Sequence, residues 1–149
     1  EITARTQSSA QDHDLAMDCS VPAGVVPVYG DSVRLSQVIS NLLENAIKYV
    51  PARGQVHITL KVDKGHAIVS VSDTGKGIPA DAVTHVFDQF FQVPQSGGSR
   101  SHRGMGLGLY ISREIIHAHD GRIWVESQEG KGSTFAFSLS LMPESEAKS

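Results

Sequence analysis

Apolar residues recur at spacings of three and four between residues 31 and 50 of this chain of 149 residues. This period predicts an amphipathic helix with one side facing a core. Asp31 can cap the start of the helix, and Val50 followed by Pro51 ends it. The apolar positions are Leu35, Val38, Ile39, Leu42, Ala46 and Ile47.

Strict alternation of apolar and polar residues predicts strands elsewhere. Residues 55–62 and 66–73 alternate on either side of Asp63-Lys64-Gly65, which predicts a hairpin. Residues 122–127 and 133–141 predict a second hairpin, and residues 14–20 a short strand. Because side chains alternate across a strand, two sets are each expected on one face: Ala67, Val69, Val71 and Asp73, and Phe135, Phe137, Leu139 and Leu141.

Two further helices are expected. Residues 81–91 carry an apolar stripe that includes Phe87, and a second helix runs from residue 104 to about His119. The second has Ile111, Ile115 and Ala118 among its inward candidates, and Gly121 as its stop. Residues 92–103 lack apolar periodicity and predict a mobile loop. Antiparallel hairpins without repeated β-α-β units predict an α+β fold, a two-layer α/β sandwich.

Composition predicts one globular domain over residues 12–142, preceded by the end of a linker at residues 1–11 and followed by a polar tail at residues 143–149. The net charge of -3 and the scattered basic residues argue against a nucleic-acid surface. No apolar run approaches the roughly 18 residues of a membrane span, so direct membrane contact is not expected. Cys19 has no partner for an internal disulfide and is interpreted as buried filler.

Residues 73–79, Asp-Thr-Gly-Lys-Gly-Ile-Pro, place a carboxylate at the end of an apolar row. Burying a carboxylate is costly unless it accepts hydrogen bonds, and a purine amino group could donate one. Gly75 and Gly77 leave room for a ligand and permit positive φ. An ordinary turn aspartate at a hairpin exit is the alternative.

Polar residues on the first helix, Asn41, Glu44, Asn45 and Lys48, share one face. A solvated helix face is the common explanation of such a stripe. However, an amide oxygen can ligate Mg²⁺ and a lysine can contact phosphate. Tyr49 beside this stripe either offers an aromatic face to a base or packs in the core.

Three alternating glycines in residues 104–109, Gly-Met-Gly-Leu-Gly-Leu, open the last predicted helix. Backbone amides and the positive end of a helix dipole could hold phosphate there without obstruction by side chains. A hinge or close helix packing is the alternative.

Taken in order, five segments of this chain resemble the catalytic ATP-binding domain of sensor histidine kinases. The segments are Asn41 to Tyr49, Asp73 to Pro79, Val86 to Phe91, Gly104 to Leu109 and Gly130 to Thr134. The resemblance implies a Bergerat-type sandwich, with a mixed, mainly antiparallel sheet, helices on one face and an ATP lid over about residues 92–103.

The resemblance also implies roles for individual residues. Asp73 would bind the adenine amino group, with Gly77 close to the base and Tyr49 against it. Asn45 would hold Mg²⁺, and Asn41 and Lys48 would line the phosphates. These last three form the expected catalytic set. The full expected nucleotide-binding set is Asn41, Asn45, Lys48, Tyr49, Asp73, Gly75, Gly77, Ile78, Phe87, Arg103, Gly104, Met105, Gly106, Leu107, Gly108, Leu109 and Thr134.

The implied function is presentation of Mg·ATP to a histidine on a separate dimerisation and phosphoacceptor domain, from which the phosphoryl group passes to a response-regulator receiver domain. The phosphoacceptor motif is not found in this sequence and is expected upstream in a longer protein, which could be anchored in a membrane. The domain itself is expected to be a cytoplasmic monomer.

One departure and one further feature bear on this expectation. Many family members have an arginine where this chain has Gln92, and Arg100 and Arg103 are the candidates to replace it. Asn41 stands where related hydrolytic ATPases carry a glutamate base, which favours a kinase. A non-catalytic nucleotide-sensing or partner-binding module and a hydrolytic Bergerat-fold ATPase are the alternatives.

Overall fold

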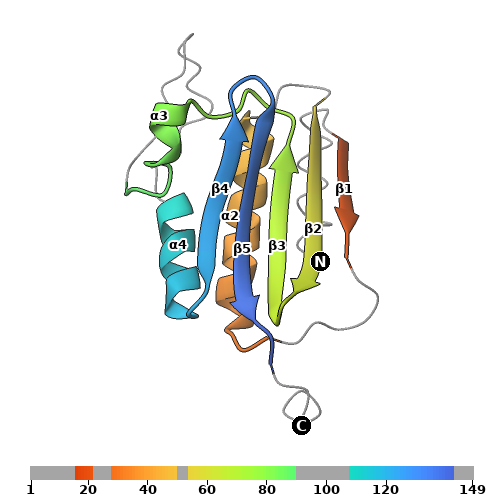
Figure 1. The fold of residues 1–149 in the computed structure, drawn as a ribbon, viewed down its shortest axis with the longest axis vertical. Coiled ribbons are helices and arrows are strands. Elements are labelled where there is room, and N and C mark those ends of the chain that lie inside the picture. The colour runs from red at the N-terminus through yellow and green to blue at the C-terminus, as the bar shows by residue number, and fades with distance from the viewer. Residues whose placement is uncertain (1–15, 22–27, 50–53, 90–107, 143–149) are drawn as a thin grey trace.

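The computed structural model describes residues 16–21, 28–49, 54–89 and 108–142. Five strands in these residues form one sheet in the order β1-β2-β3-β5-β4 (Figure 1). The parallel pair is β1 with β2, and the other neighbouring pairs are antiparallel. The strands are β1 (Ala16–Ser20), β2 (Gln55–Asp63), β3 (His66–Asp73), β4 (Arg122–Gln128) and β5 (Gly132–Ser140).

Helices α2 (Ser32–Tyr49) and α4 (Gly108–Ala118) form the second layer, and Figure 1 shows α2 running behind the sheet. The apolar side of α2 is fully buried at Val38, Leu42 and Leu43. The short helix α3 (Ala80–Val83) follows β3. The predicted two-layer α+β fold is therefore confirmed.

The start of α2 is capped as its sequence predicts. Oδ1 of Asp31 accepts hydrogen bonds from the backbone N–H groups of Val33 (2.9 Å) and Arg34 (3.2 Å). The backbone N–H of Asp31 donates in turn to Nε2 of His119 (3.0 Å), just beyond the end of α4. Nδ1 of His119 lies 2.8 Å from the carbonyl oxygen of Ile115. One imidazole thus ties the first turn of α2 to the last turn of α4.

Strand register places the buried side chains in rows across the sheet. Val71 is paired with Ile58 on one side and with Phe135 on the other, and all three belong to the core. Asp73 lies two residues beyond Val71 on β3 and therefore points to the same, helix-covered face. The predicted shared face of residues 67, 69, 71 and 73 is confirmed.

The helix predicted over residues 81–91 is wrong in length, because α3 ends at Val83. Beyond it, the backbone N–H of His85 donates to the carbonyl of Ala82, and that of Asp88 to the carbonyl of His85. These three-residue spacings belong to turns and not to an α-helix. The β-branched residues Val83, Thr84 and Val86 have low helix propensity, which disfavours a longer helix. The apolar stripe therefore reflects packing of these side chains against the core and not a regular helix.

The predicted inward face of α4 is partly wrong. Ala118 is exposed, whereas Ser112 and Ile116 are fully buried and Ile115 is buried as expected. Because Ser112 is polar, a pattern of apolar residues does not identify it as part of the buried face.

Two other local predictions need correction. Asp120 adopts the left-handed conformation after α4, with φ of 58°, whereas Gly121 is required because a Cβ there would collide with the carbonyl oxygen of Ser138. Cys19 is exposed and not buried, since β1 is at the edge of the described sheet.

Several predictions lie outside the described residues. They are the linker at residues 1–11, the loop at residues 92–103, Arg103 to Leu107, the tail at residues 143–149, and the side chains of Lys48 and Tyr49. Within the described part of the chain, no helix is long and apolar enough to cross a membrane.

Candidate functional site

A row of polar side chains crosses three strands at the end of the sheet. Ser133 of β5 is paired with Asp73 on one side and with Ser127 of β4 on the other. The next row inward, Val71, Phe135 and Val125, is apolar. The polar row therefore lies on the helix-covered face, immediately beside the core.

The Asp73 carboxylate is held by backbone groups on both sides. Its Oδ1 accepts hydrogen bonds from the N–H of Gly75 (2.9 Å) and the N–H of Ser133 (3.3 Å). Burial raises the pKa of Asp73, and these two hydrogen bonds partly oppose the increase. Among the described residues, no group donates to Oδ2. One oxygen is thus fixed and the other can accept a donor from a ligand.

The loop after Asp73 is pressed against the β4–β5 turn. Gly77 has φ of 74°, and a Cβ there would collide with the carbonyl oxygen of Gln128. The backbone N–H of Gly130 donates to the carbonyl of Lys76 (2.6 Å). Glycine at position 77 is therefore required both by conformation and by close backbone approach.

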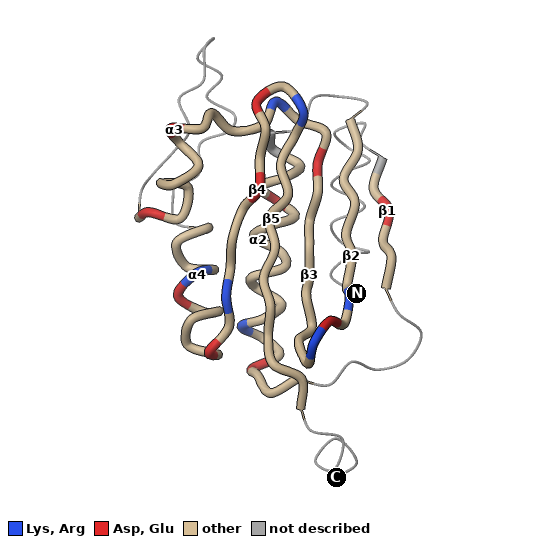
Figure 2. The backbone as a smooth tube through the Cα atoms, viewed as in Figure 1, with Lys and Arg blue, Asp and Glu red and all other residues tan. Residues whose placement is uncertain are grey.

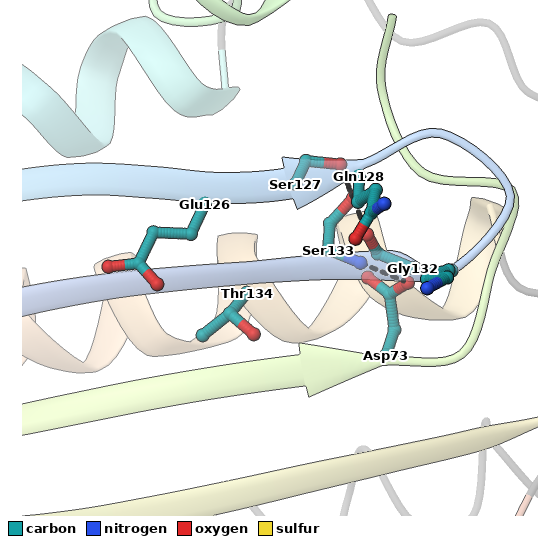
Figure 3. Close-up of a pocket in the computed structure, with 8 residues that line it drawn as sticks. Asp73, Glu126, Ser127, Gln128, Gly132, Ser133 and Thr134 are labelled. Atoms are coloured by element: carbon teal, nitrogen blue, oxygen red, sulfur yellow. Dashed lines mark hydrogen bonds between the residues drawn. The ribbon is translucent and has the colours of Figure 1, made fainter.

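Ser127 provides a third link between this loop and the turn. Its Oγ accepts a hydrogen bond from the backbone N–H of Ile78 (2.7 Å) and donates to the carbonyl of Gly132 (3.1 Å). It also lies 2.9 Å from Oγ of Ser133. Figure 3 shows this cluster beside the Asp73 carboxylate.

A polar hollow of about 370 Å³ opens at the same end of the sheet (Figure 3). Figure 2 shows both acidic and basic residues on the turns at this end. The hollow is lined by Asp73, Glu126, Ser127, Gln128, Lys131, Gly132, Ser133 and Thr134.

The asparagines of α2 are half-buried, in contrast to the exposed Glu44 between them. Nδ2 of Asn41 donates to the carbonyl of Gly108 (3.3 Å) and to Oγ of Ser112 (3.2 Å). Ser112 itself donates to the same carbonyl (2.8 Å). Asn41 therefore connects α2 to the first turn of α4, the helix that follows the glycine-rich run. No hydrogen bond of the Asn45 side chain occurs among the described residues.

The apolar members of the expected set whose side chains are described belong to the core or pack against it. Ile78 is buried in the core, and Leu109 is partly buried against the core. Phe87 stands edge-on to Phe135, with ring centroids 6.1 Å apart and an interplanar angle of 84°.

The side chain of Thr134 lies on the other face of the sheet from that of Asp73. Its Oγ1 is 2.9 Å from Oγ of Ser72 on the other face of the sheet. The residue of β5 that shares the face of Asp73 is Ser133, which the sequence-based set omitted. The signal was present, because Ser133 has the same parity as the predicted buried residues Phe135 and Phe137.

Two other serines were also missed. Ser127 and Ser112 are isolated hydroxyl residues whose importance comes from partners distant in sequence. No motif or periodicity in the sequence indicates either contact.

The residues present suit an adenine nucleotide. An unpaired carboxylate oxygen can accept from an amino group, and the half-buried amide of Asn41 on α2 contacts the start of α4. Gly108 is exposed, and among the described residues a Cβ there would meet nothing closer than the side chain of Asn41, at 3.9 Å. A mixed sheet with helices on one face, an aspartate at the end of β3 and an asparagine-bearing helix define a nucleotide-binding α/β sandwich.

The chain belongs to the family of histidine kinase-, DNA gyrase B- and HSP90-like ATPases, whose model matches residues 30–143. It is 39% identical over 140 residues to the adaptive-response sensory kinase SasA of Microcystis aeruginosa, covering 93% of this chain and 36% of SasA. This chain thus spans about a third of the length of that relative. The resemblance inferred from the five sequence segments is confirmed.

Solved structures agree on the fold. The catalytic domain of histidine kinase ThkA, in a nucleotide-free form, matches with a TM-score of 0.81 and 29% identity, covering 95% of this chain and 90% of that one. Full-length ShkA in complex with AMPPNP matches with a TM-score of 0.81 and 28% identity over 94% of this chain and 28% of ShkA. The fold is that of histidine kinase catalytic domains.

Proposed function

We propose that this chain binds Mg·ATP and presents it for transfer of the γ-phosphoryl group to a histidine on a separate dimerisation domain, from which it passes to the aspartate of a response-regulator receiver domain. The family assignment and the kinase relatives support this proposal. The observation that carries it is the Asp73 carboxylate, fixed through Oδ1 and with Oδ2 available at the end of β3.

Asp73 is proposed to accept a hydrogen bond from the adenine amino group. Gly75 presents no side chain beside it, whereas the space that the missing side chain of Gly77 would fill is taken by the backbone of Gln128. Ile78 and Phe87 supply apolar surface against which a base can pack. A half-buried carboxylate acceptor opposite an amino donor discriminates against bases that present a carbonyl oxygen there. Thr134, which faces the other side of the sheet, has the weakest support among the expected contacts.

Asn45 is proposed to ligate Mg²⁺, with Asn41 and Lys48 near the phosphates. The Asn45 amide oxygen is of the ligand type that Mg²⁺ accepts. ATP supplies the transferable phosphoryl group, and this chain's residues would orient it and offset its charge. Arg103 and residues 104–107 remain proposed contacts on sequence resemblance alone.

A hydrolytic ATPase is the second candidate, and the contacts of Asn41 count against it. Both described hydrogen bonds of Asn41 are donated by Nδ2, to Gly108 and Ser112. An ionised carboxylate only accepts, so at this position it could not bond the Gly108 carbonyl, and it could bond Ser112 only if that hydroxyl gave up its own bond to Gly108. The present packing of α2 against α4 thus favours an amide.

Transfer to a phosphoacceptor domain tests the proposal directly. This chain should be mixed with a separately made dimerisation and phosphoacceptor domain from a kinase such as SasA and with γ-labelled ATP. We expect acid-labile label on the added domain, as a phosphohistidine requires. Abundant free phosphate without labelled protein would instead support the hydrolytic ATPase, and absence of ATP binding would exclude both.

The proposed metal ligand can be tested by titration with ADP in the presence and absence of Mg²⁺. Asn45→Ala should remove most of the gain in affinity that Mg²⁺ gives. Gln37→Ala is the matched control, since Gln37 is an exposed amide on the same helix. An unchanged Mg²⁺ dependence in Asn45→Ala would contradict the assignment.

A further inference from the structure

The Ser127 hydroxyl uses its full hydrogen-bonding capacity within the structure. It accepts from the N–H of Ile78 and donates to the carbonyl of Gly132, so the remaining lone pair accepts from the hydroxyl of Ser133. One side chain thereby joins the loop after β3 to both strands of the β4–β5 hairpin.

Each partner of Ser127 lies next to a group that would surround the base. Ile78 follows Gly77 directly and is 9% exposed. Ser133 donates its backbone N–H to the Asp73 carboxylate. Gly132 packs so closely on the carbonyl group of Asp73 that a Cβ on Gly132 would collide with it. The hydroxyl of Ser127 therefore links the loop that contains Gly77 to the strand that donates to the Asp73 carboxylate.

We propose that Ser127 is a positioning residue that gives the site its preference for adenine over bases with a carbonyl oxygen at the same position. This inference rests on the proposed binding of ATP. Ser127 need not touch the nucleotide; it fixes the distance and angle at which Asp73 meets the base. Discrimination by a buried hydrogen bond depends on such fixed geometry, because a mobile acceptor can rearrange around the wrong base.

The other two links between the loop and the turn do not replace this one. The bond from Gly130 to Lys76 and the contact of Gly77 with Gln128 hold the first half of the loop. The N–H of Ile78 has Ser127 as its partner in the described structure. Without the hydroxyl, that buried donor is unpaired and the second half of the loop is free to shift.

Ser127→Ala, Ser127→Thr and the wild type should be compared by calorimetric titration with Mg·ADP and with Mg·IDP, which carries a carbonyl oxygen in place of the amino group. We expect Ser127→Ala to bind ADP about tenfold more weakly and to lose most of the preference for ADP over IDP, as removal of one buried hydrogen bond implies. Ser127→Thr keeps the hydroxyl and should restore the preference. The amide of Ile78 should exchange its hydrogen faster in nucleotide-free Ser127→Ala than in the wild type.

Ser72→Ala is the matched control. Ser72 forms a hydroxyl pair with Thr134 at the same end of the sheet but on the opposite face. This variant should keep the wild-type ratio of ADP to IDP affinity. If Ser127→Ala does not fold, Ser127→Cys supplies a side chain of similar size with a weak hydrogen-bonding group and carries the same expectation.

Two results would overturn the inference. One is a wild-type ADP to IDP ratio in Ser127→Ala or Ser127→Cys. The other is an equal loss in Ser127→Thr, since packing and not the hydroxyl would then be responsible. If the wild type itself bound neither nucleotide, the proposed function would fail instead, so the two failures are distinguishable.

Discussion

The Asp73 carboxylate is aligned by the backbone N–H of Ser133, the residue paired with it across β3 and β5, at 3.3 Å. A half-buried carboxylate of this kind serves binding at a cost to the free energy of folding. Burial raises its pKa, which means that ionisation of this carboxyl is less favourable in the folded than in the unfolded chain.

Asp73→Asn should separate these two effects. Because the folded-state pKa lies above the ordinary value of 3.8, ionisation of Asp73 destabilises the fold progressively as pH rises through the interval between those two values. The urea midpoint of the wild type should therefore fall relative to that of Asp73→Asn across this interval. A difference between the two urea midpoints that does not change with pH would contradict the raised pKa of Asp73.

The same substitution should weaken nucleotide binding. Asparagine can still accept through its oxygen, but its NH₂ group can occupy the place of Oδ2 and would oppose an adenine amino group. We expect ADP affinity to fall about ten- to hundredfold, as for loss of a hydrogen bond to a charged group. Calorimetric titration at neutral pH measures this. Wild-type affinity in a folded Asp73→Asn protein would exclude the proposed role.

Gly77→Ala should be far more damaging than Gly130→Ala. Both glycines have positive φ, 74° and 85°, so each substitution carries a conformational cost of roughly 1–2 kcal/mol. Of these two, only Gly77 would bring the added Cβ against backbone; at Gly130 no atom of the described part of the chain lies within 4 Å. Urea denaturation should show a larger loss of stability for Gly77→Ala, accompanied by loss of ADP binding. Equal losses for the two variants would mean that the close approach to Gln128 is unimportant.

Asn41→Asp should loosen α4 from α2 even without nucleotide. The substitution replaces the donor to Gly108 and Ser112 with an acceptor that faces a carbonyl oxygen. We expect a loss of about 1–3 kcal/mol in the free energy of unfolding of the nucleotide-free protein. Gln37→Glu makes the same chemical change at an exposed position one turn earlier and is the control. Comparable stability of the two variants would argue against the link.

His119 should occur as the tautomer protonated at Nδ1 when neutral. Nδ1 faces the carbonyl of Ile115 and must donate, whereas Nε2 accepts from the N–H of Asp31. Nitrogen NMR of the imidazole distinguishes the tautomers directly. His119→Ala should cost about 1 kcal/mol, while His117→Ala, at an exposed position of the same helix, should cost less. The opposite tautomer would exclude the bond to Asp31.

Local periodicity sufficed for much of this fold. The alternation in β3 placed Asp73 on the buried face, and the spacing of Leu42 and Ala46 indicated the orientation of α2. These elements were predictable because each buries one face continuously, so that their side-chain pattern reflects their geometry.

The contacts that could not be predicted from the sequence join residues far apart along the chain. The hydrogen bond from Ile78 to Ser127 spans 49 residues, and that from Asn41 to Ser112 spans 71. The helix predicted over residues 81–91 shows a different error, because a helical spacing of apolar residues occurs there without a regular helix. The helix α3 ends at Val83, and Val86 beyond it is buried through tertiary packing. The choice between Ser133 and Thr134 is different, because alternation along β5 is enough to place Ser133 on the face of Asp73.

The position of β3 between β2 and β5 also has a consequence for biosynthesis. Asp73 and Ser133 are separated by 60 residues, so β3 leaves the ribosome well before the strand that completes its second edge. Until then that edge is unpaired and open to association with other chains. The carboxylate can acquire its backbone donor from β5 only after β5 has been synthesised. Nucleotide binding should therefore select chains whose sheet is complete, and nucleotide in the cell would favour productive folding of this domain by mass action.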